Sequence, residues 1–229
     1  MEGIAVYNNN NYLQISGDNR NYSFLGKQTI NFKKASGWAM KNNSMITTSF
    51  NPDELIAFNC TNNVGIGSMY LPHMVNGFKI YRFSTDIQKD TQVNFYRFGI
   101  KENSTPGKHF EVYNSLGERV FSDTDRYLKI IDNINVAVNP TYAVNLNNPS
   151  TGTIIGNTFA ATKKLAVIAT MPCFAINIPQ YALNMGFATY TFTSSSCDCK
   201  WFWDGGMDKY SSALMQRFCN YLVVDVTGL

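Results

Sequence analysis

Short hydrophobic segments recur along the chain at intervals of about eight to twelve residues, separated by clusters of Asn, Gly, Ser and Pro. The segments are rich in β-branched and aromatic residues, and several alternate from residue to residue as a strand does. This pattern predicts an all-β fold. The clearest candidate strands are Ile4–Tyr7, Tyr12–Ile15, Thr29–Phe32, Leu55–Phe58, Phe78–Phe83 and Val93–Phe98.

The second half of the chain resembles the first half at a nearly constant spacing, which indicates a tandem duplication. Four blocks arrive in the same order, at offsets between 106 and 110 residues. They pair Val6-Tyr7-Asn8 with Val112-Tyr113-Asn114, Leu55–Phe58 with Leu165–Ile168, Gly77–Ser84 with Gly186–Thr193, and Phe95-Tyr96 with Phe202-Trp203.

The duplication predicts two tandem, mutually similar β-sandwich-like domains, covering residues 1–103 and 109–229. Residues 104–108 form the predicted linker, because this stretch is polar and contains Pro106 and Gly107. Each domain has a length close to the roughly 100 to 150 residues that are common for domains.

Each repeat opens with a predicted β-hairpin. In the second repeat, Phe110–Tyr113 and Arg119–Ser122 flank a short loop in which Gly117 supplies a positive φ. In the first repeat, Asn8–Asn11 occupies the same place, and Asn is the best substitute for Gly at such a position. We therefore interpret the asparagine run as a hairpin tip.

The second repeat has a C-terminal extension that the first lacks. From Asp208 to Cys219 the spacing of Tyr210, Leu214 and Phe218 fits one short helix, and a loop fits equally well. The last hydrophobic segment, Leu222–Val226, predicts a terminal strand.

Composition adds that the surface is polar but carries little charge. Only 15% of the residues are charged, whereas 27 Asn, 18 Thr and 16 Ser make up more than a quarter of the chain. The formal net charge of +3 comes from residues scattered along the sequence, and basic residues cluster only in pairs such as Lys33-Lys34. Nucleic acid is therefore not an expected partner, since a phosphate-binding surface gathers basic residues on one face.

The amino terminus has no basic segment followed by an apolar one, so we predict no secretory signal. The longest apolar stretch, Leu165–Ile178, contains Pro172 and falls short of the roughly 20 residues that a membrane span needs. Five cysteines, an odd number in a chain without an export signal, are expected to stay reduced.

The segment from Trp201 to Asp208 is the most unusual part of the sequence. As a strand it places Trp201 and Trp203 on one face, next to Asp204, with Tyr210 close behind. These four residues are the candidate binding site. The sequence leaves two interpretations open. In one, these side chains pack in the core or in a protein interface, where Trp is enriched; in the other, the indole rings stack on a saccharide and the carboxylate hydrogen-bonds to it.

Residues for catalysis or metal binding are sparse. The two histidines, His73 and His109, lie in no known catalytic motif, and nucleophile elbows and phosphate-binding loops are missing from the sequence. Cys197-Asp198-Cys199 brings two thiols together, but structural zinc usually needs two such ligand pairs. We expect no enzymatic activity, no cofactor and no metal.

Several segments resemble a poorly characterised family of tailed-bacteriophage, tail-associated virion proteins. They are Gly3–Asn8, Phe110–Asp123, Arg126-Tyr127-Leu128 and Val223–Leu229, and together with their surroundings they cover about a third of the chain. The resemblance implies a non-enzymatic virion protein that is synthesised in the host cytoplasm and attached to the tail tip or a tail fibre. It assigns no catalytic residue.

The expected partners are accordingly other virion proteins, together with further copies of the chain in a symmetric assembly. A low content of charge suits such contacts, because interface cores contain few charged residues. Two alternatives remain open from the sequence: a tail adhesin that binds a host-surface glycan or outer-membrane protein, and a capsid decoration protein.

Overall fold

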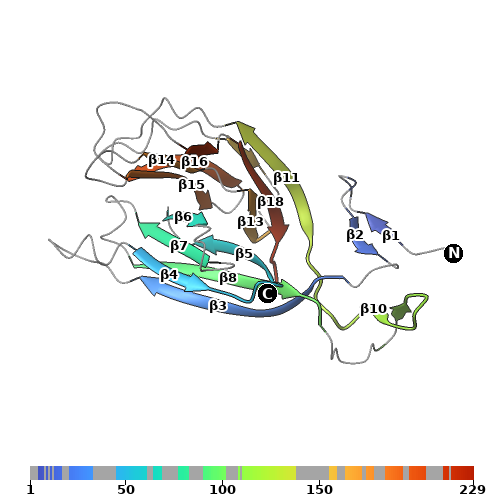
Figure 1. Ribbon diagram of the computed structural model, residues 1–229. Helices are drawn as coiled ribbons and strands as arrows, with labels where there is room; N and C mark the ends of the chain where they lie inside the picture. The colour runs from blue at the N-terminus through green and yellow to red at the C-terminus, as the bar shows by residue number, and fades with distance from the viewer. Residues whose placement is uncertain are drawn as a thin grey trace.

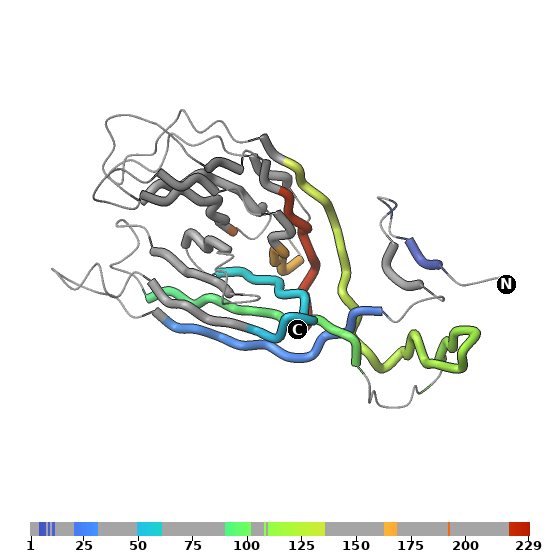
Figure 2. Tube along the Cα trace, viewed as in Figure 1, coloured from blue at the N-terminus to red at the C-terminus, as the bar shows by residue number. Residues whose placement is uncertain are grey.

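The computed structural model describes 5–7, 9, 11, 13–16, 21–32, 45–60, 64–68, 77–82, 90–101, 108, 110–137, 155–158, 163–171, 174–177, 184–192, 196–204, 214–216 and 218–229, for some strands as backbone alone. Within these residues every regular element is a β-strand and none is a helix (Figures 1 and 2). The prediction of an all-β fold is confirmed.

The largest sheet has six antiparallel strands in the order β11-β18-β13-β5-β8-β3. Three of these strands precede the predicted linker and three follow it, and they meet where Val167 of β13 pairs with Phe58 of β5. One sheet thus crosses the predicted boundary, and two separate tandem domains are not confirmed. The strands are β3 Ser23–Phe32, β5 Leu55–Cys60, β8 Thr91–Gly99, β11 Ile130–Ala137, β13 Leu165–Met171 and β18 Phe218–Asp225.

Two smaller sheets form a second layer against the large sheet (Figure 1). One has the order β4-β7-β6 and the other β12-β16-β15-β14-β17, and β6 lies beside β15. The rings of Phe58 and Phe192 meet between the layers, with centroids 6.4 Å apart. The strands are β4 Met45–Ser49, β6 Val64–Ser68, β7 Gly77–Arg82, β12 Ile155–Thr158, β14 Phe174–Asn177, β15 Asn184–Phe192, β16 Ser196–Asp204 and β17 Leu214–Gln216.

Two β-hairpins lie beyond one end of the large sheet (Figure 1). The first hairpin joins β1 Ala5–Tyr7 to β2 Leu13–Ser16, and the second joins β9 Glu111–Tyr113 to β10 Arg119–Ser122. Both predicted hairpins are confirmed.

The strand order of the large sheet reads alike from its two edges, which fits an approximate two-fold axis between β5 and β13. From one edge to the axis the order is β3, β8, β5, and from the other edge it is β11, β18, β13. Both edge strands carry a bulge at the same place, between Phe24 and Gly26 in β3 and between Ile130 and Asp132 in β11. A shared irregularity of this kind supports the duplication more strongly than shared strand order does.

The two repeats also contact each other through residues at or just before the start of the edge strands β3 and β11. The Leu128 amide donates to the Tyr22 carbonyl at 2.9 Å, and the Phe24 amide donates to the Arg126 carbonyl at 2.6 Å. Tyr22 and Leu128 are equivalent positions of the two repeats. The two edges of the sheet therefore converge at the end where the hairpins lie.

One of the four sequence blocks is placed differently by the structure. Phe95 and Tyr96 lie in β8, whose counterpart in the second half is β18, because each is flanked by the bulged edge strand and the central strand. Phe202 and Trp203 lie in β16, which belongs to a smaller sheet. Among the described strands, the three-stranded sheet has no counterpart of β16 or β17.

The described residues of the C-terminal extension form strands, whereas the spacing of its hydrophobic residues also allowed one short helix. Within the predicted helix, Leu214–Gln216 and Phe218–Cys219 belong to strands, and 208–213 fall outside the described residues. The predicted terminal strand is confirmed as the end of β18. β18 has hydrogen-bonded neighbours on both sides, β11 and β13, so completing the sheet satisfies more backbone groups than a surface helix would.

The core draws on both repeats. One buried cluster combines Tyr96 and Phe98 from the first repeat with Ile168 and Val224 from the second, each at most 4% exposed. A buried side chain also links the two halves of the sheet. Asn59 of β5 donates from Nδ2 to the Leu165 carbonyl of β13 at 2.9 Å.

Candidate functional site

The four residues of the predicted binding site are only partly described. Trp201, Trp203 and Asp204 lie in β16, between β12 and β15, where they pair with Ala188, Gly186 and Met185 of β15. Their side chains and the whole of Tyr210 lie outside the described residues, as do the side chains of Cys197 and Cys199, so this binding site stays a prediction.

The structure describes a second candidate site at the base of the second hairpin. Asp125, in the turn after β10, is reached by the Lys101 ammonium, whose Nζ lies 2.9 Å from Oδ1. The Asp125 side chain is only 5% exposed. Because a buried carboxylate is costly without a partner, this ion pair ties the hairpin to the end of β8.

Tyr127 is the aromatic centre of this site. Its hydroxyl accepts a hydrogen bond from the Ser122 amide at 2.6 Å and donates to Asp125 Oδ2 at 3.4 Å. Its ring stacks on Phe121, with centroids 4.8 Å apart and planes 18° apart. Burial, which disfavours the charged phenolate, raises the pKa of Tyr127 to about 12.

The hairpin above this base is internally cross-linked. Arg119 and Glu111 form an ion pair across the two strands, and Tyr113 donates to Glu111 Oε2 at 2.8 Å. At the tip the Asn114 carboxamide oxygen accepts from the Leu116 and Glu118 amides, at 3.0 and 2.9 Å. The turn is thus held by its own side chain, as Asn does in loops.

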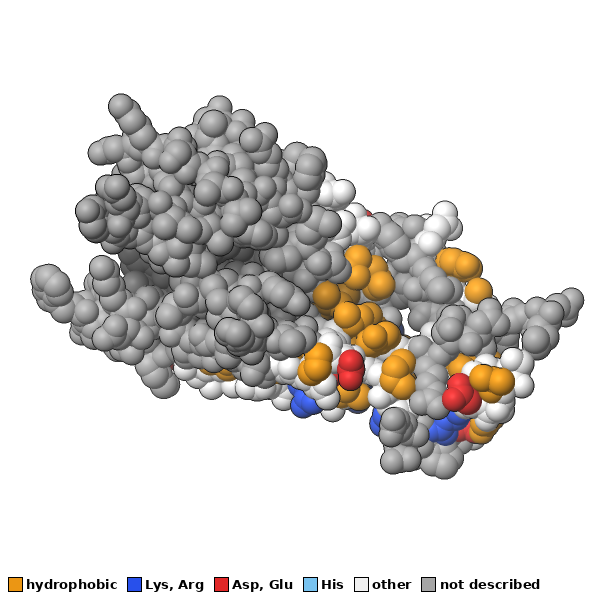
Figure 3. Space-filling view, in the orientation of Figure 1, with side chains coloured by type: hydrophobic (Ala, Val, Ile, Leu, Met, Phe, Trp, Pro, Cys, Tyr) orange, Lys and Arg blue, Asp and Glu red, His pale blue; other side chains and the backbone are white. Residues whose placement is uncertain are grey.

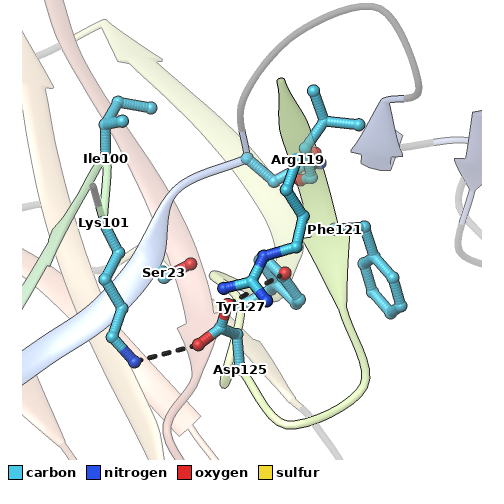
Figure 4. Close-up of a pocket in the computed structure, with 9 residues that line it drawn as sticks. Ser23, Ile100, Lys101, Arg119, Phe121, Asp125 and Tyr127 are labelled. Atoms are coloured by element: carbon cyan, nitrogen blue, oxygen red, sulfur yellow. Dashed lines mark hydrogen bonds and ion pairs between the residues drawn. The ribbon is translucent and has the colours of Figure 1, made fainter. Parts of the chain in front are cut away.

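The hairpin base closes tightly on the first repeat. Asn21 donates from Nδ2 to the Val120 carbonyl at 2.6 Å, and the space left between the two surfaces is about 10 Å³, room for one water. Figure 4 shows Lys101 and Ser23 on one side of this space, with Arg119, Asp125 and Tyr127 on the other. Lys101 pairs with Asp125 and Arg119 pairs with Glu111, so the arrangement is suited to anchoring the hairpin.

A larger groove opens next to the same site. It has a volume of about 570 Å³ and runs between the turn after β10 and the last residues of the chain. One wall contains Phe121 and Tyr127, and the other contains Asp225 and Thr227. Arg126 spans the two walls, donating to the Gly228 carbonyl at 2.6 Å.

Among the described side chains, most of the large hydrophobic ones that are exposed lie on or next to the two hairpins. Tyr7 and Tyr113, which are equivalent positions, are 57% and 55% exposed, and Leu116 at the second tip is 81% exposed. Val6 and Phe110 add to this surface. In Figure 3 coloured hydrophobic side chains lie on the hairpins and over the adjoining end of the large sheet, on the face shown. Such exposed aromatic residues are common in protein contacts.

No cluster of three or more potential metal ligands occurs among the residues described above. The Cys60 side chain is buried in β5. The described part of the chain includes no helix long and apolar enough to cross a membrane.

Sequence reasoning missed the anchoring residues Lys101, Asp125 and Tyr127. Their roles depend on the approach of the second hairpin to the end of β8, which is a tertiary contact. The repeat alignment held one usable signal, because it showed that both repeats open with the same hairpin. Comparison of the chain with family models, with curated proteins and with solved structures gives no match.

Proposed function

We propose that the chain is a non-enzymatic structural protein of a bacteriophage virion, attached at the tail tip or a tail fibre through protein–protein contacts. The observation that carries the proposal is the pair of equivalent hairpins, which hold Tyr7 and Tyr113 more than half exposed. Aromatic side chains that bury large areas with little loss of conformational freedom are effective anchors in protein interfaces.

The electrostatics of the second hairpin support a role in protein contacts. Its Glu111 and Arg119 already pair with each other, so a partner that covers these two strands leaves neither of the two charges without a counter-charge. The resemblance of the hairpin sequences to tail-associated virion proteins supplies the setting. Further copies of the chain and other virion proteins are the proposed partners.

The rigid base of the second hairpin supports the same role. The Lys101–Asp125 pair and the Tyr127 hydroxyl hold β10 against the first repeat. A hairpin that is fixed before binding loses less conformational entropy when a partner covers it.

Mass spectrometry of gradient-purified particles from the phage that encodes this chain tests the proposal. We expect the chain in the particles at a stoichiometry above one, and tagged chain located at the tail by electron microscopy. Its absence from purified particles, with abundant chain left in the lysate, would refute the proposal.

A variant with Tyr7→Ser and Tyr113→Ser tests whether the hairpins make the contact with the particle, without disturbing the fold. Both side chains are exposed, so the variant is expected to fold with near-normal stability and to lose incorporation into particles. Gln28→Ser is the matched control, because Gln28 is an exposed position of β3 away from the hairpins. Normal incorporation of the double variant would remove the hairpins from the proposed contact.

A further inference from the structure

The molecule contains one example of a hairpin docked on a repeat. The second hairpin closes on four residues of the first repeat, Asn21, Ser23, Ile100 and Lys101, which lie before β3 and after β8. Contact is close, because the remaining space holds only about 10 Å³. The first repeat therefore has a surface that fits a hairpin of the opposite repeat.

The approximate two-fold axis gives the second repeat an equivalent surface. When the two repeats are aligned at the bulges of β3 and β11, Asn21 is equivalent to Tyr127 and Ser23 is equivalent to Lys129. Because β8 pairs with β3 as β18 pairs with β11, Lys101 is equivalent to Thr227. Three of the four equivalent positions, Tyr127, Lys129 and Thr227, line the groove of about 570 Å³, and the fourth, Val226, is buried beside them in the chain. The groove is thus the open counterpart of the surface that the second hairpin fills.

We propose that this groove is the docking site for the first hairpin, β1–β2, of a second copy of the chain. The exchange is reciprocal, so each copy donates one hairpin and accepts one. The dimer closes with two-fold symmetry, because both contacts are the same contact. This inference rests on the proposed assembly function for its biological setting, and it names the self-association surface.

The first hairpin matches the second in the features that shape a docked arm. Ala5 pairs with Ser16 as Glu111 pairs with Ser122, and in both hairpins the ladder shifts register after the second pair, Val6–Ile15 and Val112–Phe121. The turn of each hairpin contains a residue with positive φ. The two hairpins therefore share the backbone features that shape a docked arm.

Charge and position favour a second copy as the source of the hairpin. Residues 5–16 contain no charged side chain, so their docking adds no like charge next to Arg126 and Lys129 in the groove. The described lining of the groove includes no residue of the chain's own first hairpin, which lies to the side of β11 in Figure 1. Two contacts made together strengthen each other, since the second becomes intramolecular after the first.

Native mass spectrometry and light scattering on the purified full chain test the exchange. The wild-type chain is expected to reach twice its 25.8 kDa mass as its concentration rises. Lys129→Trp fills the groove at an exposed position, and deletion of residues 1–16 removes the hairpin, so each variant is expected to stay monomeric. Gln28→Trp adds the same bulk at an exposed position of β3 and is expected to dimerise normally.

Mixing the two monomeric variants is the decisive measurement. The Lys129→Trp chain still has its hairpin and the deleted chain still has its groove, so the mixture is expected to form a one-to-one heterodimer. This outcome also shows that both variants are folded. Wild-type chain that stays monomeric at every concentration, or homodimers that survive either change, would overturn the inference. A monomeric chain that is nevertheless present in virions would leave the proposed function standing.

Discussion

Asn11 and Gly117 hold the same turn position in the two hairpins, with φ angles of 62° and 76°. They are 106 residues apart, the offset at which the hairpin sequences align. Positive φ is inexpensive for Gly and tolerable for Asn, whereas other residues pay about 1–2 kcal/mol in this region. Asn11 and Gly117 thus meet the same requirement for a positive φ with two different side chains.

Substitution at the second tip tests this equivalence. Gly117 has open space around it, so Gly117→Ala is expected to cost only its backbone strain, about 1 kcal/mol. Gly117→Asn is the matched control and is expected to be close to neutral, because Asn11 already serves in the first hairpin. Hydrogen exchange of the β9 and β10 amides measures the change, and equal protection in both variants would contradict it.

Asn59 links the two repeats through a buried polar network. It donates to the Leu165 carbonyl and accepts from Asn94 Nδ2 at 3.0 Å. Asn59→Ala leaves these groups unsatisfied in the core, so we expect a loss of about 2–3 kcal/mol, or roughly 5–10 °C in Tm. Asn31→Ala, at an exposed site of β3, is expected to stay within about 0.5 kcal/mol. Calorimetry compares the two, and equal melting temperatures would contradict the network's role.

The Lys101–Asp125 ion pair is expected to hold the second hairpin to the sheet. Lys101→Met leaves the nearly buried Asp125 carboxylate with a weakened set of partners, at a cost of about 1–3 kcal/mol. The amides of β10 should then exchange faster with solvent than in the wild-type chain. Lys108→Met removes an exposed lysine nearby and serves as the control. Unchanged protection of β10 in Lys101→Met would show that the hairpin is held by other contacts.

Tyr127 is expected to make stability fall at alkaline pH. Burial raises its pKa to about 12 in the folded chain, above the value near 10 of the unfolded chain. Its contribution is therefore complete below about pH 10 and is lost as the pH rises through about 12. Tyr127→Phe should show a shallower decline between about pH 10 and 12, measured by urea unfolding at each pH. A decline equal to that of the wild-type chain would contradict this assignment.

The sequence predicted those features that depend on local spacing. Alternation and turn residues located β5, β7, β8 and both hairpins, and the asparagine run predicted the tip at which Asn11 has a positive φ. The all-β class follows from the same local pattern. These features depend on a few neighbouring residues, which is why a sequence alone reveals them.

The candidate site at the hairpin base was not predicted from the sequence. The predicted site at Trp201 and Trp203 stays a prediction, and the described contacts add an anchored hairpin base and a groove around Asp125 and Tyr127. Lys101 and Asp125 are ordinary charged residues in the sequence. They form a site only because the second hairpin folds back on the end of β8, and no local pattern encodes that approach.

The sequence by itself predicted the all-β class, the turn chemistry of the two hairpins and a duplication within the chain. Tertiary structure alone decided how the repeats combine. The predicted boundary at 104–108 is polar and suits a linker, yet β5 and β13 pair across the repeats in one continuous sheet. The reason is that a strand such as Leu55–Cys60 or Leu165–Met171 leaves backbone groups unpaired at any open edge, and the edge of a similar repeat satisfies them. Sequence shows that two units are alike, but the pairing of their edges emerges only when both are folded.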